Sequence, residues 1–245
     1  RFNENYGDKL YMFEAHVGDE NKDFEIFGKA DDIISTSDML LELQNDKDAK
    51  IDEGDYLRAR LFDMLVGDWD RHEDQWRWAL HEQEDGTKLY KPIPRDRDQA
   101  FPKYDGVFPF LLKAASPLAR NMQTYAAEIP NVKTFNNAPY YLDKTFINGA
   151  SWSDWEKQAK RIQNSLTDGI IDEAFSNLLE DTKDQSIRSI QSTLKERREN
   201  IVSIARDYYD YFKKHEVIVA TNKDNKIDIK RLPNGETKII VTQKD

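Results

Sequence analysis

The chain of 245 residues contains no cysteine. Disulfide bridges and zinc sites with cysteine ligands are therefore excluded. The missing cysteine does not indicate a redox compartment, because reducing and oxidising environments both tolerate a cysteine-free chain.

Long apolar runs are missing as well. No stretch approaches the ~18 consecutive apolar residues of a membrane-spanning helix, and no signal-peptide pattern opens the chain. We therefore predict no membrane span in this sequence. The chain begins with Arg1 and not with Met. This start leads us to expect a processed protein or a piece of a longer one, whose other domains would then be its partners.

Positive charge is in deficit, with 36 Lys and Arg against 46 Asp and Glu and a net charge of -10. Nucleic-acid binding needs a basic surface that displaces counterions, so we expect no nucleic-acid partner. Hydrophobic residues make up 38% of the chain, which includes 12 Phe, 11 Tyr and 5 Trp. This content predicts a packed core and not a disordered chain.

The apolar spacing predicts a mostly helical α+β fold. Leu57, Leu61 and Met64 share one face of a helix that Asp55 would cap and Gly67 would end. Further helices are predicted at 39–43, at 153–166 behind a capping box that starts at Ser153, at 169–180 and at 184–214. Strands are predicted at 9–17, 24–29, 76–81 and 88–93, a charged loop at 45–50, a helix start at Ser116-Pro117, and irregular structure at 131–150.

The end of the chain differs in character from the rest. Apolar β-branched residues recur from residue 216 onward, and Asn234-Gly235 is a turn signal between two strand-like runs. We therefore predict two units, a main domain over residues 1–215 and a small β-rich appendage over residues 216–245.

Two acidic motifs carry the chemistry. Gly67–Trp76 reads Gly-Asp-Trp-Asp-Arg-His-Glu-Asp-Gln-Trp, and Pro94–Phe101 reads Pro-Arg-Asp-Arg-Asp-Gln-Ala-Phe. Between them, Asp85-Gly86 lies between two strand-like runs and predicts a β-hairpin. Such a hairpin brings the two motifs together at low entropic cost.

The region from about residue 24 to 101 resembles the catalytic lobe of atypical, protein-kinase-like folds. These are the spore-coat, secretory-pathway, persistence-toxin and phosphatidylinositol kinases, in which an Asp-Arg-His catalytic loop precedes a metal-binding Asp. The resemblance implies the C-terminal lobe of a protein-kinase-like fold. It also implies ATP-dependent phosphoryl transfer to a hydroxyl with Mg²⁺ or Mn²⁺. The sequence does not identify the phosphoacceptor.

The resemblance assigns roles to individual residues of the first motif. Asp70 matches the catalytic Asp that accepts the proton of the substrate hydroxyl, and Arg71 and His72 complete the catalytic loop. Gln75 stands five residues after Asp70, where the family often has an Asn that binds the nucleotide's second metal ion. Gln75 is therefore the candidate for cofactor and metal binding in this motif, and its departure from Asn puts the second metal in doubt.

The resemblance also assigns roles in the second motif. Asp96 matches the Asp that binds the metal on the nucleotide phosphates, because Phe101 follows five residues later as in the family pattern. Asp98 resembles an additional metal-binding Asp of the spore-coat kinases. The segments also resemble the middle of large bacterial cell-envelope proteins, which suggests the periplasmic side of the envelope.

Other features favour different interpretations. The ten glycines are all isolated, so no Gly-rich loop covers a phosphate, and no clear strand Lys pairs with a helix Glu. This favours a non-catalytic kinase-like module for interaction or scaffolding within a larger protein. A purely structural cation site, or a charged loop that is only solvated surface, would also be consistent with these motifs. An EF-hand is disfavoured, because Glu73 and Ala79 occupy the positions of its Gly and its bidentate Glu.

Overall fold

The computed structural model describes residues 17–104, 106–107, 111–112, 116–178, 183–215, 218 and 224–243. The fold is α+β, and its helices outnumber its strands as expected. The predicted strand at 9–17 lies outside the described residues except for Val17. Parts of the segments at 107–122 and 216–224 lie outside them too.

A four-stranded sheet lies beside the motifs, in the order β1-β3-β4-β2. Its strands are β1 (Asp32–Ser35), β2 (Ala49–Ile51), β3 (Trp76–Glu82) and β4 (Lys88–Pro94). β3 and β4 form the predicted hairpin, in which Trp76 pairs with Pro94. β1 pairs with β3 in antiparallel and β2 with β4 in parallel. The predicted loop at 45–50 was wrong in part, because β2 begins there.

The N-terminal predictions were confirmed in part. Helix α2 (Thr36–Asn45) begins behind Ser35, whose side chain accepts the amide of Asp38. The predicted strand at 24–29 is wrong, because this segment forms the short 3-10 helix η2 (Glu25–Phe27) and then turns at Gly28. Two further 3-10 helices, η1 (Asp19–Asn21) and η3 (Glu73–Gln75), lie before β3 in the part of the chain that the structure describes.

Helix α3 (Glu53–Val66) leads directly into the first motif. Its cap is Asp52, which accepts the amide of Asp55, so the predicted cap at Asp55 was wrong by one turn. Gly67 ends the helix as predicted, with a positive φ of 81°. The side chains of Leu57, Leu61 and Met64 are buried together.

The C-terminal half is helical. After η4 (Pro117–Asn121) follow α5 (Val132–Phe135), α6 (Tyr140–Phe146), α7 (Trp152–Ser165), α8 (Asp168–Ser176) and α9 (Gln185–Phe212). The irregular segment predicted at 131–150 is wrong, because α5 and α6 lie there. The capping box joins Ser151 to Asp154, two residues before the predicted position.

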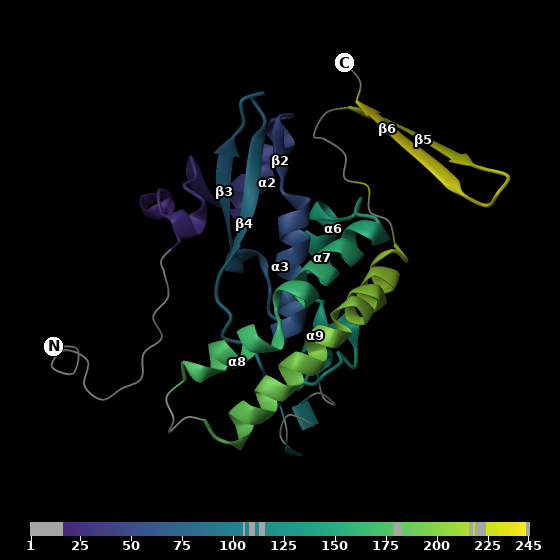
Figure 1. Ribbon diagram of the computed structural model, residues 1–245. Coiled ribbons are helices and arrows are strands. Elements are labelled where there is room, and N and C mark those ends of the chain that lie inside the picture. Colours follow the sequence, from purple (N-terminus) through teal and green to yellow (C-terminus); the bar gives the residue numbers. More distant parts are fainter. Residues whose placement is uncertain are drawn as a thin grey trace.

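The core lies where α3 packs between the sheet and helices α7 and α9 (Figure 1). Trp76 and Trp78 of β3 pack against Tyr56 of α3, and all three are fully buried. Trp155 of α7 packs against Tyr208 of α9. The aromatic residues therefore join α3 to the sheet and α7 to α9.

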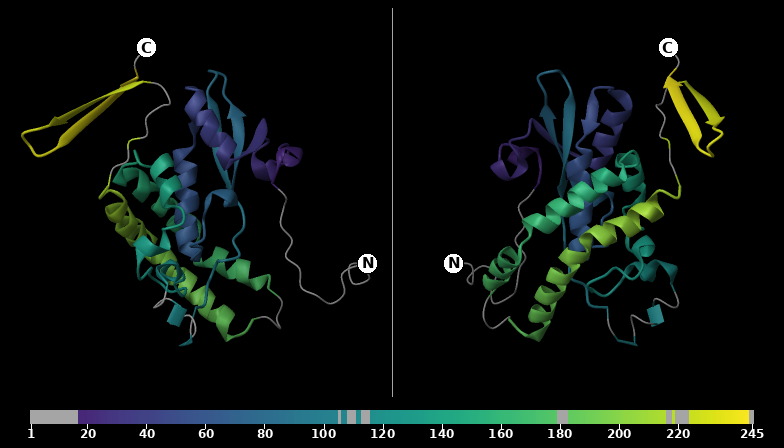
Figure 2. Two further views of the ribbon diagram at one scale, coloured as in Figure 1. Left: turned by 180° about the vertical axis from the view of Figure 1, so that it is seen from behind. Right: turned by 45° about the vertical axis from the view of Figure 1, so that its right-hand side comes forward.

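The last two strands, β5 (Asn225–Arg231) and β6 (Thr237–Gln243), pair with each other as a hairpin. The views of Figures 1 and 2 agree that this hairpin projects away from the helices. The hairpin confirms the predicted strands around Asn234-Gly235, while the division of the chain into units at 1–215 and 216–245 stays a prediction. Among the described residues, no helix has the length and apolarity needed to cross a membrane.

Candidate functional site

The side chain of Arg71 connects the two acidic motifs through hydrogen bonds. Its guanidinium is fully buried and donates to Asp63 of α3 at 3.1 Å and to Asp68 of the first motif. It also donates to the main-chain oxygen of Arg95, the residue directly before Asp96. The side chain that follows Asp70 thus holds the backbone that precedes Asp96.

Asp63 is the centre of the network around Arg71. Its carboxylate is 0% exposed and forms ion pairs with Arg60 at 2.9 Å, Arg71 at 3.1 Å and Arg97 at 3.1 Å. Three guanidinium groups compensate the loss of hydration of one carboxylate, as a buried charge requires. Because Arg97 lies between Asp96 and Asp98, the same carboxylate also anchors the second motif.

Arg60 extends the network to the C-terminal helices. It donates to Asp143 of α6 at 2.9 Å and to Asn136 at 2.7 Å. Asp143 also accepts the hydroxyls of Tyr56 at 2.8 Å and Tyr208 at 2.7 Å. The acidic motifs are thereby fixed to α3, α6 and α9.

The hairpin register brings Gln75 and Asp96 to the same end of the sheet. Trp76 pairs with Pro94, and the amide of Arg95 donates to the main-chain oxygen of Gln75 at 2.8 Å. Gln75 and Arg95 are therefore neighbours across the strands, and Asp96 is the next residue. The side-chain oxygen of Gln75 is buried and lacks a hydrogen-bond partner among the described residues.

Asp96 adopts a backbone conformation that is uncommon outside glycine. Its φ is +49°, in the left-handed region, and Phe101 at the end of the motif has a φ of +55°. Asp and Asn enter this region more readily than other non-glycine residues. The turn directs the chain out of β4, and Asp96 and Asp98 are exposed at its surface.

Tyr104 joins the two motifs a second time. Its hydroxyl accepts the indole N–H of Trp69 at 3.1 Å and donates to Gln99 at 2.8 Å. Burial raises the pKa of the Tyr104 phenol, and the negative charges of Asp70 and Asp98 raise it further. The hydroxyl of Tyr104 therefore connects Trp69 of the first motif with Gln99 of the second.

The carboxyl group of Asp68 has a raised pKa. Burial raises its pKa from 3.8 to about 6, although the neighbouring Arg71 acts in the opposite direction. One of its carboxylate oxygens meets Arg71 and the other is buried without a hydrogen-bond partner among the described residues. The loss of hydration therefore outweighs the ion pair.

The remaining predicted residues lie on the surface of the same loop. Asp70 is half-buried and His72 is exposed. No group of three His, Cys, Asp or Glu side chains in the described part of the chain is arranged to hold a metal ion. A cation at this site would therefore need oxygen ligands from Gln75 or from a bound phosphate in addition to the carboxylates. Mg²⁺ is commonly held in this way, by one or two carboxylates together with substrate phosphates.

Sequence reasoning missed the residues that build the network. Asp63, Arg60 and Arg97 looked like ordinary charges of an acidic chain, and Asp143 lay in a segment predicted to be irregular. One signal was present for Arg60 and Asp63. Both fall among the buried positions of α3, where apolar residues are usual, and they are spaced by three residues so that they can pair.

Comparisons with known proteins identify no family for this chain. No protein-family model, no curated protein and no solved structure matches it.

Proposed function

We propose that the two acidic motifs form a kinase-like site that transfers a phosphoryl group from ATP to a hydroxyl. The observation that supports this best is the bond from Arg71 to the main-chain oxygen of Arg95. It holds the loop of Asp70 beside the turn of Asp96. A base and a metal ligand must be near each other, because both act on one phosphoryl group.

Each residue has a role in this proposal. Asp70 accepts the proton of the acceptor hydroxyl, and His72 flanks it on the same loop. Asp96 and Asp98, with the side-chain oxygen of Gln75, would hold the Mg²⁺ or Mn²⁺ of the nucleotide. The metal would supply charge neutralisation at the phosphates. Arg71 acts as a positioning residue, because its guanidinium is fully occupied by protein groups.

A second function is a non-catalytic, kinase-like module that binds other domains of a longer envelope protein. The exposed Asp96 and Asp98 and the lack of a preassembled group of three acidic or histidine ligands among the described residues favour it. The two functions differ in one measurable property, the binding of a divalent cation to the folded chain.

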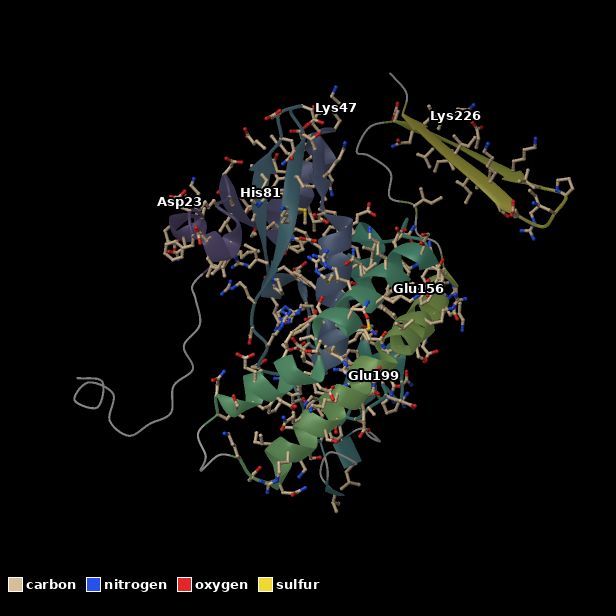
Figure 3. The ribbon with its side chains drawn as sticks, in the orientation of Figure 1. Asp23, Lys47, His81, Glu156, Glu199 and Lys226 are labelled. Atoms are coloured by element: carbon tan, nitrogen blue, oxygen red, sulfur yellow. The ribbon has the colours of Figure 1, made fainter. Side chains whose placement is uncertain are left out.

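Metal-dependent thermal stability distinguishes the two functions. Under the catalytic proposal, Mn²⁺ at ten times its Kd stabilises the chain by about 1.4 kcal/mol, which raises Tm by roughly 3–6 °C. Asp96→Asn should remove most of this shift. Asp23→Asn, a matched change at an exposed position between η1 and η2 (Figure 3), should leave it intact. A Tm that does not respond to millimolar Mn²⁺ in the unaltered chain would support the scaffold and contradict the catalytic proposal.

Phosphoryl transfer itself gives a further test of the catalytic proposal. The chain lacks a Gly-rich loop over the phosphates, and such loops supply much of the positioning in kinases. We therefore expect slow transfer from ATP, which Asp70→Asn abolishes without lowering Tm by more than a few degrees. Transfer that persists in Asp70→Asn would show that another group is the base.

A further inference from the structure

A cavity of about 450 Å³ lies between α3, β4 and the end of α7. Its apolar wall includes Phe62, Pro92 and Pro94, and its polar groups include three arginines, Arg58, Arg97 and Arg161, and a single carboxylate, Asp55. Its size falls in the range of small-molecule sites, which usually combine apolar walls with a few polar groups. Figure 3 shows side-chain nitrogen atoms gathered between these elements.

The cavity has positive charge in excess, on a chain with a net charge of -10. Asp55 is engaged by Arg58 at 2.6 Å, and Arg97 is held from behind by Asp63 at 3.1 Å. Arg161 is exposed and has no ion-pair or hydrogen-bond partner among the described residues. One full positive charge therefore lacks an opposite charge at the rim.

Arg97 contributes a second positive charge to the cavity. Its guanidinium lies over the ring of Phe62 at 5.1 Å from the ring centre. Asp63 forms its ion pair with Arg97 from outside the cavity, because Asp63 is not among the lining residues. A negative group in the cavity would therefore be attracted by Arg97 as well as by Arg161.

We propose that this cavity binds a phosphate monoester of a small apolar molecule. The planar guanidinium fork of Arg161 fits two phosphate oxygens at once, and Arg58 and Arg97 add charge from the facing walls. The apolar part of the ligand then packs against Phe62 and the two prolines. This inference does not depend on the phosphoryl transfer proposed above, because neither Asp70 nor Asp96 lines the cavity.

Calorimetric titration with phenyl phosphate and with inorganic phosphate, at constant ionic strength in chloride, tests the proposal. The unaltered chain should bind phenyl phosphate more tightly than inorganic phosphate, because only the ester covers the apolar wall. Arg161→Gln should raise the Kd of phenyl phosphate about tenfold, because one charge-assisted contact is lost. Lys157→Gln removes the same charge from an exposed position on α7 outside the cavity, and it should bind as the unaltered chain does.

A second variant leaves Arg161 unchanged and so separates a loss of binding from an effect of Arg161→Gln on folding. Ser165→Glu places a carboxylate at the exposed rim and should abolish binding of the ester while the circular dichroism spectrum stays unchanged. The proposal is overturned if the unaltered chain does not bind phenyl phosphate at millimolar concentration. It is equally overturned if Arg161→Gln binds it unchanged, or if inorganic phosphate binds as tightly as the ester.

Discussion

At the scale of single residues, Asp68 shows how burial can outweigh an ion pair. The carboxylate meets Arg71, yet its pKa is raised to about 6, because burial disfavours the charged form. The folded chain therefore binds a proton more tightly than the unfolded chain, whose Asp68 titrates near 3.8. The contribution of Asp68 to stability is fully present below pH 3.8 and is lost as the pH rises through 6.

Asp68→Asn should remove this pH dependence, because the amide resembles the protonated carboxyl in shape. The unfolding free energy of the unaltered chain, relative to that of the variant, should fall by up to about 3 kcal/mol between pH 4 and pH 7. Urea unfolding at a series of pH values measures this difference. Parallel pH profiles for the two chains would show that the pKa of Asp68 is the same in the folded and unfolded chains.

At the scale of elements, the turn from α3 into the first motif is closely packed. Gly67 has a φ of +81°, and a Cβ atom there would lie 2.8 Å from the ring of Tyr125, 3.2 Å from Pro102 and 3.3 Å from Arg197. Tyr125 in turn donates its hydroxyl to the main-chain oxygen of Leu65. The helix end therefore requires glycine for two reasons, its backbone conformation and its lack of a side chain.

Gly86 provides a matched control for Gly67. It has nearly the same φ, +83°, but a Cβ atom there meets nothing within 4 Å. Gly86→Ala should cost about 1–2 kcal/mol of unfolding free energy, the strain of a left-handed residue alone. Gly67→Ala should cost at least about 1 kcal/mol more, because overpacking adds to that strain. Equal losses in chemical unfolding would contradict the packing argument.

The sequence predicted those elements whose signals are local. The hairpin at Asp85-Gly86 and the helix end at Gly67 follow from turn chemistry, and both were confirmed. The cap of α3 was misplaced because Asp52 and Asp55 are both good caps, and only the folded backbone decides between them. Helix α6 was missed because Pro139 looks like a break, whereas it occupies the position directly before the helix.

The candidate site was less predictable than the fold, for a physical reason. The motif residues were recognisable by type and spacing, whereas Arg60 and Asp63 were marked only by their place on the apolar face of α3. The second carboxylate that pairs with the buried Arg60 is Asp143, 83 residues further along the chain. A partner at such a distance leaves no pattern in the sequence around Arg60.

At the scale of the whole molecule, Asp143 connects helices from both halves of the chain. It accepts Arg60 of α3 and Tyr208 of α9 and is itself fully buried in α6. Asp143→Asn leaves Arg60 with less negative charge around it and two hydroxyls with weaker acceptors. We expect a loss of about 3–5 kcal/mol in unfolding free energy, as for other broken buried pairs.

Asp210→Asn is the control for this change. Asp210 pairs with Arg206 at 3.0 Å on the exposed face of α9, and its loss should cost less than about 0.5 kcal/mol. Denaturant unfolding followed by both fluorescence and circular dichroism measures both variants. A small loss in Asp143→Asn would show that the helices are held together by their apolar contacts alone.

The network around Asp63 also divides the electrostatics of the molecule into two parts. Inside, the positive charges of Arg60, Arg71 and Arg97 balance the negative charges of three aspartates, Asp63, Asp68 and Asp143. The excess of acid is therefore carried by the surface, where charges repel one another and where dissolved salt screens them. Higher ionic strength should thus relieve the repulsion at the surface and leave the ion pairs of the fully buried Arg60, Arg71 and Asp63 almost unchanged, because mobile ions do not reach them.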